Sequence, residues 1–280
     1  SPSLIKNVAS IRARGVDIAL NSVNTKGLLA WSTQLNLNLY RDEVMDYYQP
    51  SDLGANFVGS GIVASPLKGY PVYSVFSYRF AGLDPANGNP LGYVNGVVSS
   101  DYAAIINTTK VGELAYSGPA FPTVFGNIGN TFTYAGFSLT ARISYKLGYR
   151  FGRTSIHYNN LFNSGTGGHP DYAKRWQQPG DELHTNVPSL IYPANARRDA
   201  FYLNSEATVE RADNIKLDEV FLSYDIPLNK GGSFKSLRFY LFGNNLNLML
   251  WKANKVGLDP DVIYGLRMKP AIAAGFKFNY

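Results

Sequence analysis

The chain has no cysteine, few charged residues and no long apolar run. Without cysteine, disulfide frameworks, thiol nucleophiles and Cys-ligated metals are excluded. Charged residues make up only 16% of the 280 residues, well below the usual quarter. No stretch approaches the ~20 consecutive apolar residues that a membrane-spanning helix needs. A spanning barrel is not excluded by this, because its strands are short and alternate polar with apolar side chains.

Clusters of chemistry-bearing residues are also missing from the sequence. His157, His169 and His184 do not have a metal-ligand spacing such as H-x-x-x-H. The Gly-rich segment 165–168 is not followed by the Lys-Ser/Thr of a phosphate-binding loop. No serine has the setting of a nucleophile elbow. We therefore expect no enzyme activity, no metal and no cofactor.

Positive charge is present but is not gathered in one place. The net charge is +6, yet Lys and Arg are scattered and the longest cluster is Arg197-Arg198. A nucleic-acid-binding protein concentrates such charges on one face or helix. No nucleic-acid partner is expected.

Aromatic residues are abundant, with 20 Tyr and 16 Phe, and alternation with polar residues is frequent. Alternate positions of a strand face opposite sides of its sheet. Segment 29–39 alternates over about ten residues, which is typical of a membrane-crossing strand. We predict that one set faces outward to lipid: Leu35, Leu37, Leu39, Phe137, Leu139, Ile143, Leu222, Tyr224, Phe276 and Phe278. We predict that their polar neighbours face the interior: Gln34, Asn36, Asn38, Thr140, Arg142 and Ser223.

The alternating segments predict about nine strands. They are expected at residues 11–20, 29–39, 70–80, 91–98, 131–145, 149–161, 220–226, 237–242 and 268–280. Short turns near residues 24, 86, 147 and 231 alternate with long loops near residues 55, 115, 190 and 258. Outer-membrane barrels have this asymmetry, with short periplasmic turns and long extracellular loops. The sequence favours an all-β fold, a transmembrane antiparallel β-barrel, over a soluble β-sandwich.

The predicted strands do not make a complete barrel. An open sheet in lipid leaves unsatisfied backbone groups at both edges, so further strands must pair with it. The simplest source is the N-terminal remainder of the same polypeptide. The chain opens Ser1-Pro2-Ser3-Leu4 without an initiator Met, which fits either a mature product or a piece of a longer protein, and the strand count favours a piece. A separate gene, a proteolytic nick and a gap are all compatible with this start.

The final residues carry an aromatic pattern of their own. Phe276, Phe278 and Tyr280 share one face of the predicted last strand, and polar residues share the other. The segment from Gly275 to Tyr280 resembles the C-terminal assembly signal of bacterial outer-membrane barrels, whose last strand ends in an aromatic residue. The resemblance implies the barrel-assembly machinery and outer-membrane lipid as partners.

Four further stretches follow one another in order over nearly the whole chain. They are residues 7–17, Trp176 with Pro179-Gly180-Asp181, residues 210–227, and residues 238–246 followed by Gly257-Leu258-Asp259-Pro260-Asp261. Together they resemble the SusC-like or RagA-like TonB-dependent outer-membrane transporters of Bacteroidota. The first stretch departs from the family's pattern at Ser10 and Arg14, and Asp17 stands where the family has Glu.

The resemblance implies that residues 1–280 form the C-terminal part of a 22-stranded barrel, without the plug domain. It implies import of oligomeric nutrients, glycan or peptide, across the outer membrane. It also implies a SusD-like surface lipoprotein as partner, and TonB acting through the plug and not through this chain. The alternative is a surface-exposed or secreted β-rich glycan-binding or adhesin module without transport.

Ligand and partner contacts are expected in the long loops, near residues 42–66, 99–130, 163–212 and 249–267, which are rich in Tyr, Asn and Gly. The candidate ligand-binding residues are Trp176, Asp181, His169, His184 and Trp251. Trp176 either stacks on a ligand or pins its loop to the barrel rim. Asp259 and Pro260 are expected above all to form a turn.

Overall fold

The computed structural model describes residues 9–48, 51–59, 64, 66–227, 236–262 and 267–279. The chain divides into two compact units, which we describe separately. The loop unit comprises residues 1–13, 42–121 and 149–211. The sheet unit comprises residues 14–41, 122–148 and 212–280. Each unit is therefore built from several separate segments of the sequence.

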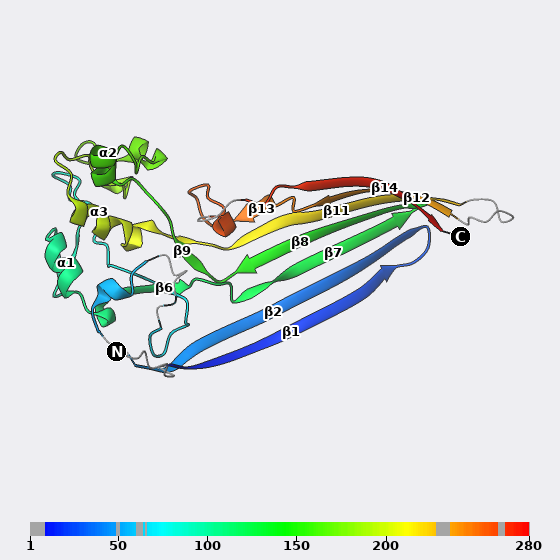
Figure 1. Ribbon diagram of the computed structural model, residues 1–280, viewed down its shortest axis with the longest axis horizontal. Helices are drawn as coiled ribbons and strands as arrows, with labels where there is room; N and C mark the ends of the chain where they lie inside the picture. Colours follow the sequence, from blue (N-terminus) through cyan, green and yellow to red (C-terminus); the bar gives the residue numbers. More distant parts are fainter. Residues whose placement is uncertain are drawn as a thin grey trace, which may run out of the picture. The chain divides into compact units, whose positions relative to one another are not determined.

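One large antiparallel sheet dominates the fold (Figure 1). Its strand order is β1 (Ala9–Thr25), β2 (Leu29–Tyr47), β7 (Val124–Tyr134), β8 (Phe137–Leu147), β11 (Asn214–Pro227), β12 (Ser236–Asn244) and β14 (Ala271–Asn279). The shorter β13 (Leu248–Lys252) also pairs with β11. It continues along β11 where β12 stops, after a break at Asn245 and Asn247, whose φ angles are 52° and 47°.

The register confirms that the two predicted sets of side chains lie on opposite faces. Leu35 pairs with Ile128, which pairs with Ile143. One position away, Asn36 pairs with Asn127, and their side chains are joined by a hydrogen bond of 3.2 Å. The registers of β2, β7, β8, β12 and β14, and of β11 from Val220 to Pro227, keep these parities, so one face is mainly apolar and the other mainly polar. On β11 a bulge between Leu217 and Glu219 shifts the register.

The prediction of a single strand over residues 131–145 is wrong. The chain turns at Ala135 and Gly136, whose φ angles are 48° and 86°, and Tyr134 pairs with Phe137. Two-residue hairpin turns of this type usually carry Asn-Gly or Asp-Gly, and Ala at positive φ is uncommon. The turn thus lacks its usual sequence mark. The prediction of a loop over residues 99–130 is wrong for Val124 to Asn130, which belong to β7.

Three other predicted strands do not belong to the large sheet. Segment 70–80 contains only β3 (Ser74–Ser77), which pairs with β6 (Ala115–Pro119) and is buried throughout. Segment 91–98 folds into the hairpin of β4 (Gly92–Val94) and β5 (Val97–Ser99). Segment 149–161 contains β9 (Arg150–Gly152), which pairs with β10 (Val209–Arg211), and then a helix. Alternation over so few residues is equally compatible with short strands in a loop region.

The described residues of the loop unit include short helices and at least two small cores, so the predicted long loops are folded. The α-helices are α1 (Tyr102–Thr108), α2 (Tyr158–Ser164) and α3 (Ala196–Leu203). The 3-10 helices of the described chain are η1 (Gly54–Asn56), η2 (Val111–Glu113), η3 (Pro170–Lys174), η4 (Asp181–Leu183), η5 (Glu206–Thr208) and, in the sheet unit, η6 (Pro260–Val262). None of the helices in the described residues has the length and apolar character needed to cross a membrane.

Phe201 of α3 is central to the larger core. Its ring packs against Tyr78 and Tyr102, with centroids 5.9 and 5.7 Å apart. Close by in the sequence, the buried Arg198 donates hydrogen bonds to Asn89 and to the Ser189 carbonyl, at 2.8 and 2.9 Å. The second core consists of Ile156, Tyr158 and Val187.

Candidate functional site: an apolar sheet face and a polar loop unit

Aromatic side chains form a row across the apolar face of the sheet. Six residues on neighbouring strands lie opposite one another across the sheet, each paired with the next: Leu29, Tyr134, Phe137, Tyr224, Phe239 and Phe276. We call these residues the aromatic row. It lies at the end of the sheet where β1 turns into β2 and β7 into β8. Within it, the rings of Phe137 and Tyr224 stack with centroids 4.3 Å apart.

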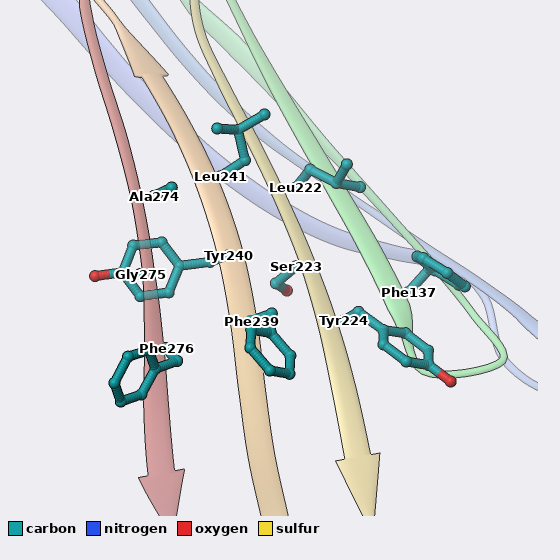
Figure 2. A pocket seen from close by; sticks show the side chains of 10 residues that line it. All are labelled: Phe137, Leu222, Ser223, Tyr224, Phe239, Tyr240, Leu241, Ala274, Gly275 and Phe276. Carbon is teal, nitrogen blue, oxygen red and sulfur yellow. The ribbon is translucent and has the colours of Figure 1, made fainter.

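A second apolar row, aliphatic on four of its six strands, follows the aromatic row toward the opposite end of the strands. The next row reads Trp31, Phe132, Leu139, Leu222, Leu241 and Ala274. Between the two rows lies a shallow hollow of about 500 Å³, lined by side chains from four strands (Figure 2). Because its walls are almost entirely apolar, it does not resemble a site for a hydrogen-bonding ligand. We assign it to the apolar face itself.

The predicted assembly signal lies on the last strand. Phe276 and Phe278 share the apolar face, with ring centroids 5.7 Å apart, and Phe276 is 65% exposed. Gly275 has a different role, because a Cβ at this position would come within 2.5 Å of the Tyr240 hydroxyl. The Tyr240 ring overlies Gly275 in Figure 2. Tyr280 lies outside the described residues, and recognition by assembly machinery stays a prediction.

The opposite face of the sheet is polar and carries ion pairs. Arg238 donates two hydrogen bonds to Asp225, at 2.7 and 2.8 Å. Arg142 lies 3.6 Å from Glu219 on the neighbouring strand. Hydroxyl and amide groups fill other positions, and the Thr131 and Thr140 hydroxyls are 2.8 Å apart. This face can form hydrogen bonds with a neutral ligand or with water.

A cluster of charged residues ties the last loop to the sheet. The Lys216 ammonium, only 3% exposed, contacts Asp259 at 2.8 Å and Asp261 at 2.6 Å. Lys146 contacts Asp261 at 2.9 Å. Asp259 also accepts a hydrogen bond from the Asp261 backbone, which confirms the predicted turn. We call these four residues the lysine clamp. From the sequence alone Asp259 is expected only to form a turn, because Lys216 lies 43 residues away along the chain.

The lysine clamp is expected to open in acid. Burial alone raises the pKa of Asp261, but hydrogen bonds from Lys216 and Lys146 and their charges lower it overall. A lowered folded-state pKa means stability that is present above the unfolded pKa and lost as the pH falls through the folded value. Hydrogen exchange of residues 253–262, corrected for intrinsic rates, should therefore rise below about pH 4. In Asp261→Asn this dependence should be weaker, and an unchanged profile would contradict the assignment.

Trp176 and Asp181 both have structural partners. Trp176 is 8% exposed, and its indole nitrogen donates to Glu182 at 3.0 Å. Its ring covers Gly88, where a Cβ would come within 2.4 Å of the indole. The Asp181 carboxylate accepts hydrogen bonds from the backbone of Gln177 and Gln178, at 2.8 and 3.1 Å. These contacts hold the loop together, and binding of a ligand by either residue stays a prediction.

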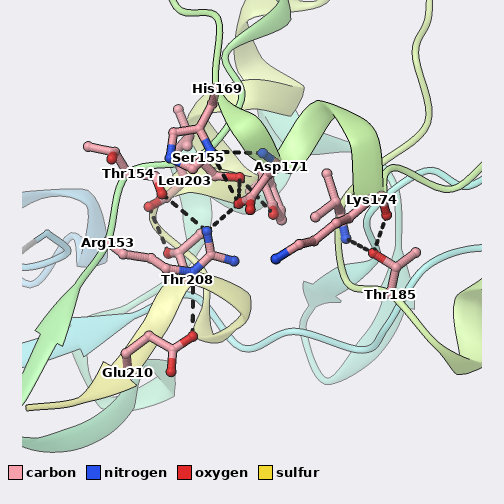
Figure 3. Close-up of polar contacts among 12 residues, drawn as sticks. Arg153, Thr154, Ser155, His169, Asp171, Lys174, Thr185, Leu203, Thr208 and Glu210 are labelled. Atoms are coloured by element: carbon pink, nitrogen blue, oxygen red, sulfur yellow. Dashed lines mark hydrogen bonds and ion pairs between the residues drawn. The ribbon is translucent and has the colours of Figure 1, made fainter. Parts of the chain in front are cut away.

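His169 borders a buried ionic network that the sequence did not reveal. Arg153 and Asp171 form a buried ion pair, and Ser155 donates to Asp171 at 2.6 Å (Figure 3). Glu210 lies 3.4 Å from the other side of the guanidinium. Burial alone raises the pKa of Asp171, but the hydrogen bonds from Ser155 and Arg153 lower it overall. No local motif marks these residues, because the network joins segments far apart in the sequence.

The candidate ligand residues are divided between the two units. Trp251 belongs to the sheet unit, on β13, and is 46% exposed. The other four belong to the loop unit. His184 is exposed, whereas the His169 ring accepts a hydrogen bond from the Asp171 backbone at 3.1 Å. Of the five, His184 and Trp251 are the most open to a ligand.

Comparison with known proteins gives a result at the level of fold. No protein-family model and no curated protein matches the sequence. The chain is similar to a structure of the RagAB peptide importer in the closed-closed state, with 20% identity, a TM-score of 0.69 and 98% of this chain covered. For the open-open state the values are 20%, 0.68 and 98%. For a further structure of the RagAB peptide transporter they are 19%, 0.64 and 97%.

The chain spans less than a third of those proteins. It covers 30% of the matched chain in the closed-closed state and 29% in each of the other two structures. At this level of identity the likeness establishes a shared fold for the sheet and its loops.

Proposed function

We propose that this chain forms the C-terminal part of a TonB-dependent outer-membrane β-barrel that imports oligomeric nutrients, either glycans or peptides. The observation that carries the proposal is the aromatic row followed by further apolar rows, on a face opposite a polar one. Spanning barrels have an apolar outer band flanked by aromatic girdles and a polar interior. The aromatic row then lies at the periplasmic interface, where the turns are short.

The apolar face argues against the alternative, a secreted binding or adhesin module. Phe137, Leu139, Phe239, Leu241 and Phe276 are each exposed on one continuous face. A soluble protein rarely exposes an apolar patch of this extent. Extraction separates the two functions, because the barrel requires detergent and the adhesin module does not.

The partners follow from the same proposal. Two sheet edges remain in a sheet of this size, and lipid does not satisfy their backbone groups. The remainder of the barrel and a plug that contacts TonB would come from residues outside this chain. A SusD-like surface lipoprotein would cover the loop side, as the names of the matched RagAB structures favour a two-protein complex. Co-purification at near-equal amounts tests the lipoprotein.

The ligand class is proposed as a neutral or weakly charged oligomer that forms many hydrogen bonds. The matched structures are of a peptide importer, which favours peptides. The Asn, Ser and Thr side chains of the polar face suit glycans as well as peptide backbones. Mass spectrometry of ligand retained in the purified complex separates the classes.

Uptake provides the functional test. Cells that lack the gene should lose uptake of at least one oligomeric glycan or peptide, and the loss should be restored by the intact gene. Unchanged uptake of every glycan and peptide tested would contradict the importer function.

A further inference from the structure

A small pocket lies entirely within the loop unit. Its volume is about 230 Å³, and its lining includes Tyr78, Arg79, Tyr93, Asn95, Thr109 and Glu113. These residues come from the end of β3, the β4–β5 hairpin, α1 and η2. Ligand pockets for drug-sized molecules usually measure about 300–1,000 Å³, so this one accommodates a single sugar or amino-acid unit.

The walls of the pocket are held firmly. Tyr78 and Ile105 are 3% and 1% exposed, and both belong to the larger core of the loop unit. The Tyr78 backbone bonds to Asn204 and Glu206, at 2.9 and 3.0 Å. On the opposite wall, Asn95 and Gly96 have φ angles of 49° and 80° and form the tight turn of the β4–β5 hairpin. A firm pocket loses little entropy when it binds a ligand.

Arg79 provides a positive charge in this pocket. Its guanidinium lies 4.4 Å from the centroid of the Tyr93 ring. Within the part of the chain that the structure describes, no carboxylate lies within ion-pair distance of Arg79. Stacking on an aromatic ring fixes the plane of the guanidinium and leaves its N–H edge free for a partner.

Of the other polar groups of the pocket, some are hydrogen-bonded within the protein and others can bond to a ligand. The Glu113 carboxylate accepts a hydrogen bond from the Lys110 backbone at 2.7 Å. Lys110 in turn pairs with Asp52, 3.0 Å away. The Asn95 amide and the Thr109 hydroxyl bond to no other side chain or backbone group among the described residues. The pocket thus offers a fixed cation, an amide and a hydroxyl.

We propose that this pocket binds a carboxylate carried by a single residue-sized unit at the end of the ligand. A planar guanidinium matches a carboxylate through two parallel hydrogen bonds, and Asn95 and Thr109 bond to neighbouring polar groups of the same unit. Two ligands carry this chemistry, a peptide with a free C-terminus and an oligosaccharide that ends in a uronic acid. The inference rests on the proposed import of oligomers, to which it adds a recognition site.

Binding to the intact detergent-purified complex tests the site by isothermal titration calorimetry. One pair of probes is a tripeptide with a free C-terminus and the same tripeptide as its C-terminal amide. The second pair is a galacturonic acid trimer and its methyl ester. Arg79→Gln should weaken binding of an acid probe about tenfold to a hundredfold, since it removes a charge-assisted pair of hydrogen bonds. Binding of the neutral probe should stay unchanged.

Arg175 provides a matched control. Its guanidinium also lies over a tyrosine ring, 4.1 Å from the centroid of Tyr172, but outside the pocket. Arg175→Gln should leave the binding affinity for all four probes unchanged. Arg79→Lys keeps the charge without the planar pair of donors, so it should restore only part of the acid-probe affinity.

The outcomes distinguish a peptide ligand from an acidic glycan, and the recognition site from the proposed import function. If Arg79→Gln loses affinity only for the acid tripeptide, the site is supported and assigned to peptides. If it loses affinity only for the galacturonic acid trimer, the site is supported and assigned to acidic glycans. Equal loss for acid and neutral probes, no loss in Arg79→Gln, or no binding of either acid probe overturns the site. Uptake of neutral oligomers by cells carrying Arg79→Gln separates failure of the recognition site from failure of the proposed import function. This uptake persists if only the recognition site is wrong, and it is absent if the import function is wrong.

Discussion

Ile143→Arg is expected to destabilise the membrane-inserted sheet by ~2–4 kcal/mol. Ile143 lies on the apolar face, paired with Ile128. From Phe137 in the aromatic row to Ile143, the strand advances about 20 Å at ~3.3 Å per residue. With a tilt of roughly 45°, this is about 14 Å of depth, near the middle of an apolar band ~25 Å tall. A buried guanidinium is most costly at that depth.

Two matched variants give this prediction its control. Thr140→Arg places the same side chain on the polar face of the same strand and should have little effect. Leu139→Arg lies one row from the aromatic row and should cost less than Ile143→Arg, because the cost falls toward the interface. Urea unfolding of the full-length barrel in lipid vesicles measures all three. Equal losses for Ile143→Arg and Thr140→Arg would contradict the assignment of the faces.

Asp171→Ala is expected to destabilise the loop unit by about 3–5 kcal/mol. The substitution removes the buried carboxylate that pairs with Arg153 and accepts from Ser155. Glu210 remains 3.4 Å from the guanidinium and compensates only in part. Breaking a buried pair costs far more than an exposed one, because the remaining charge stays in a medium of low polarity.

Local hydrogen exchange of residues 150–175 in the intact protein measures this effect, since the rest of the barrel can stay folded. Asp52→Ala serves as control, because its pair with Lys110 is exposed and worth at most about 1 kcal/mol. Protection factors that fall equally in the two variants, or that stay unchanged in Asp171→Ala, would show that the buried network does not stabilise the unit.

The sequence predicts the faces of the long strands well because alternation there is a direct consequence of the pleat. Leu35, Asn36 and Leu37 lie in a strand with partners on both sides, so neighbouring side chains have no choice of face. The hairpin at Ala135 and Gly136 is not predicted from the sequence, because Ala135 adopts a positive φ where such turns usually carry Asn or Asp.

Alternation was least informative in the loop unit. β3, Ser-Val-Phe-Ser, is buried on both faces, so its sequence does not report a boundary between two environments. The pairing of Arg153 with Asp171 and Glu210 depends on how distant segments fold back on each other. Such contacts are set by tertiary packing and leave no periodic trace in the sequence.

The packing of Phe201 has a consequence for the order in which the protein folds. Phe201 lies in the segment between β8 and β11, and its partners Tyr78 and Tyr102 lie in the segment between β2 and β7. The core of the loop unit can therefore form only after these two separate segments of the chain have come into contact. Contacts of such high sequence separation slow folding. We expect the hairpin of β7 and β8 to form early and the Phe201 core to be among the last structures to form.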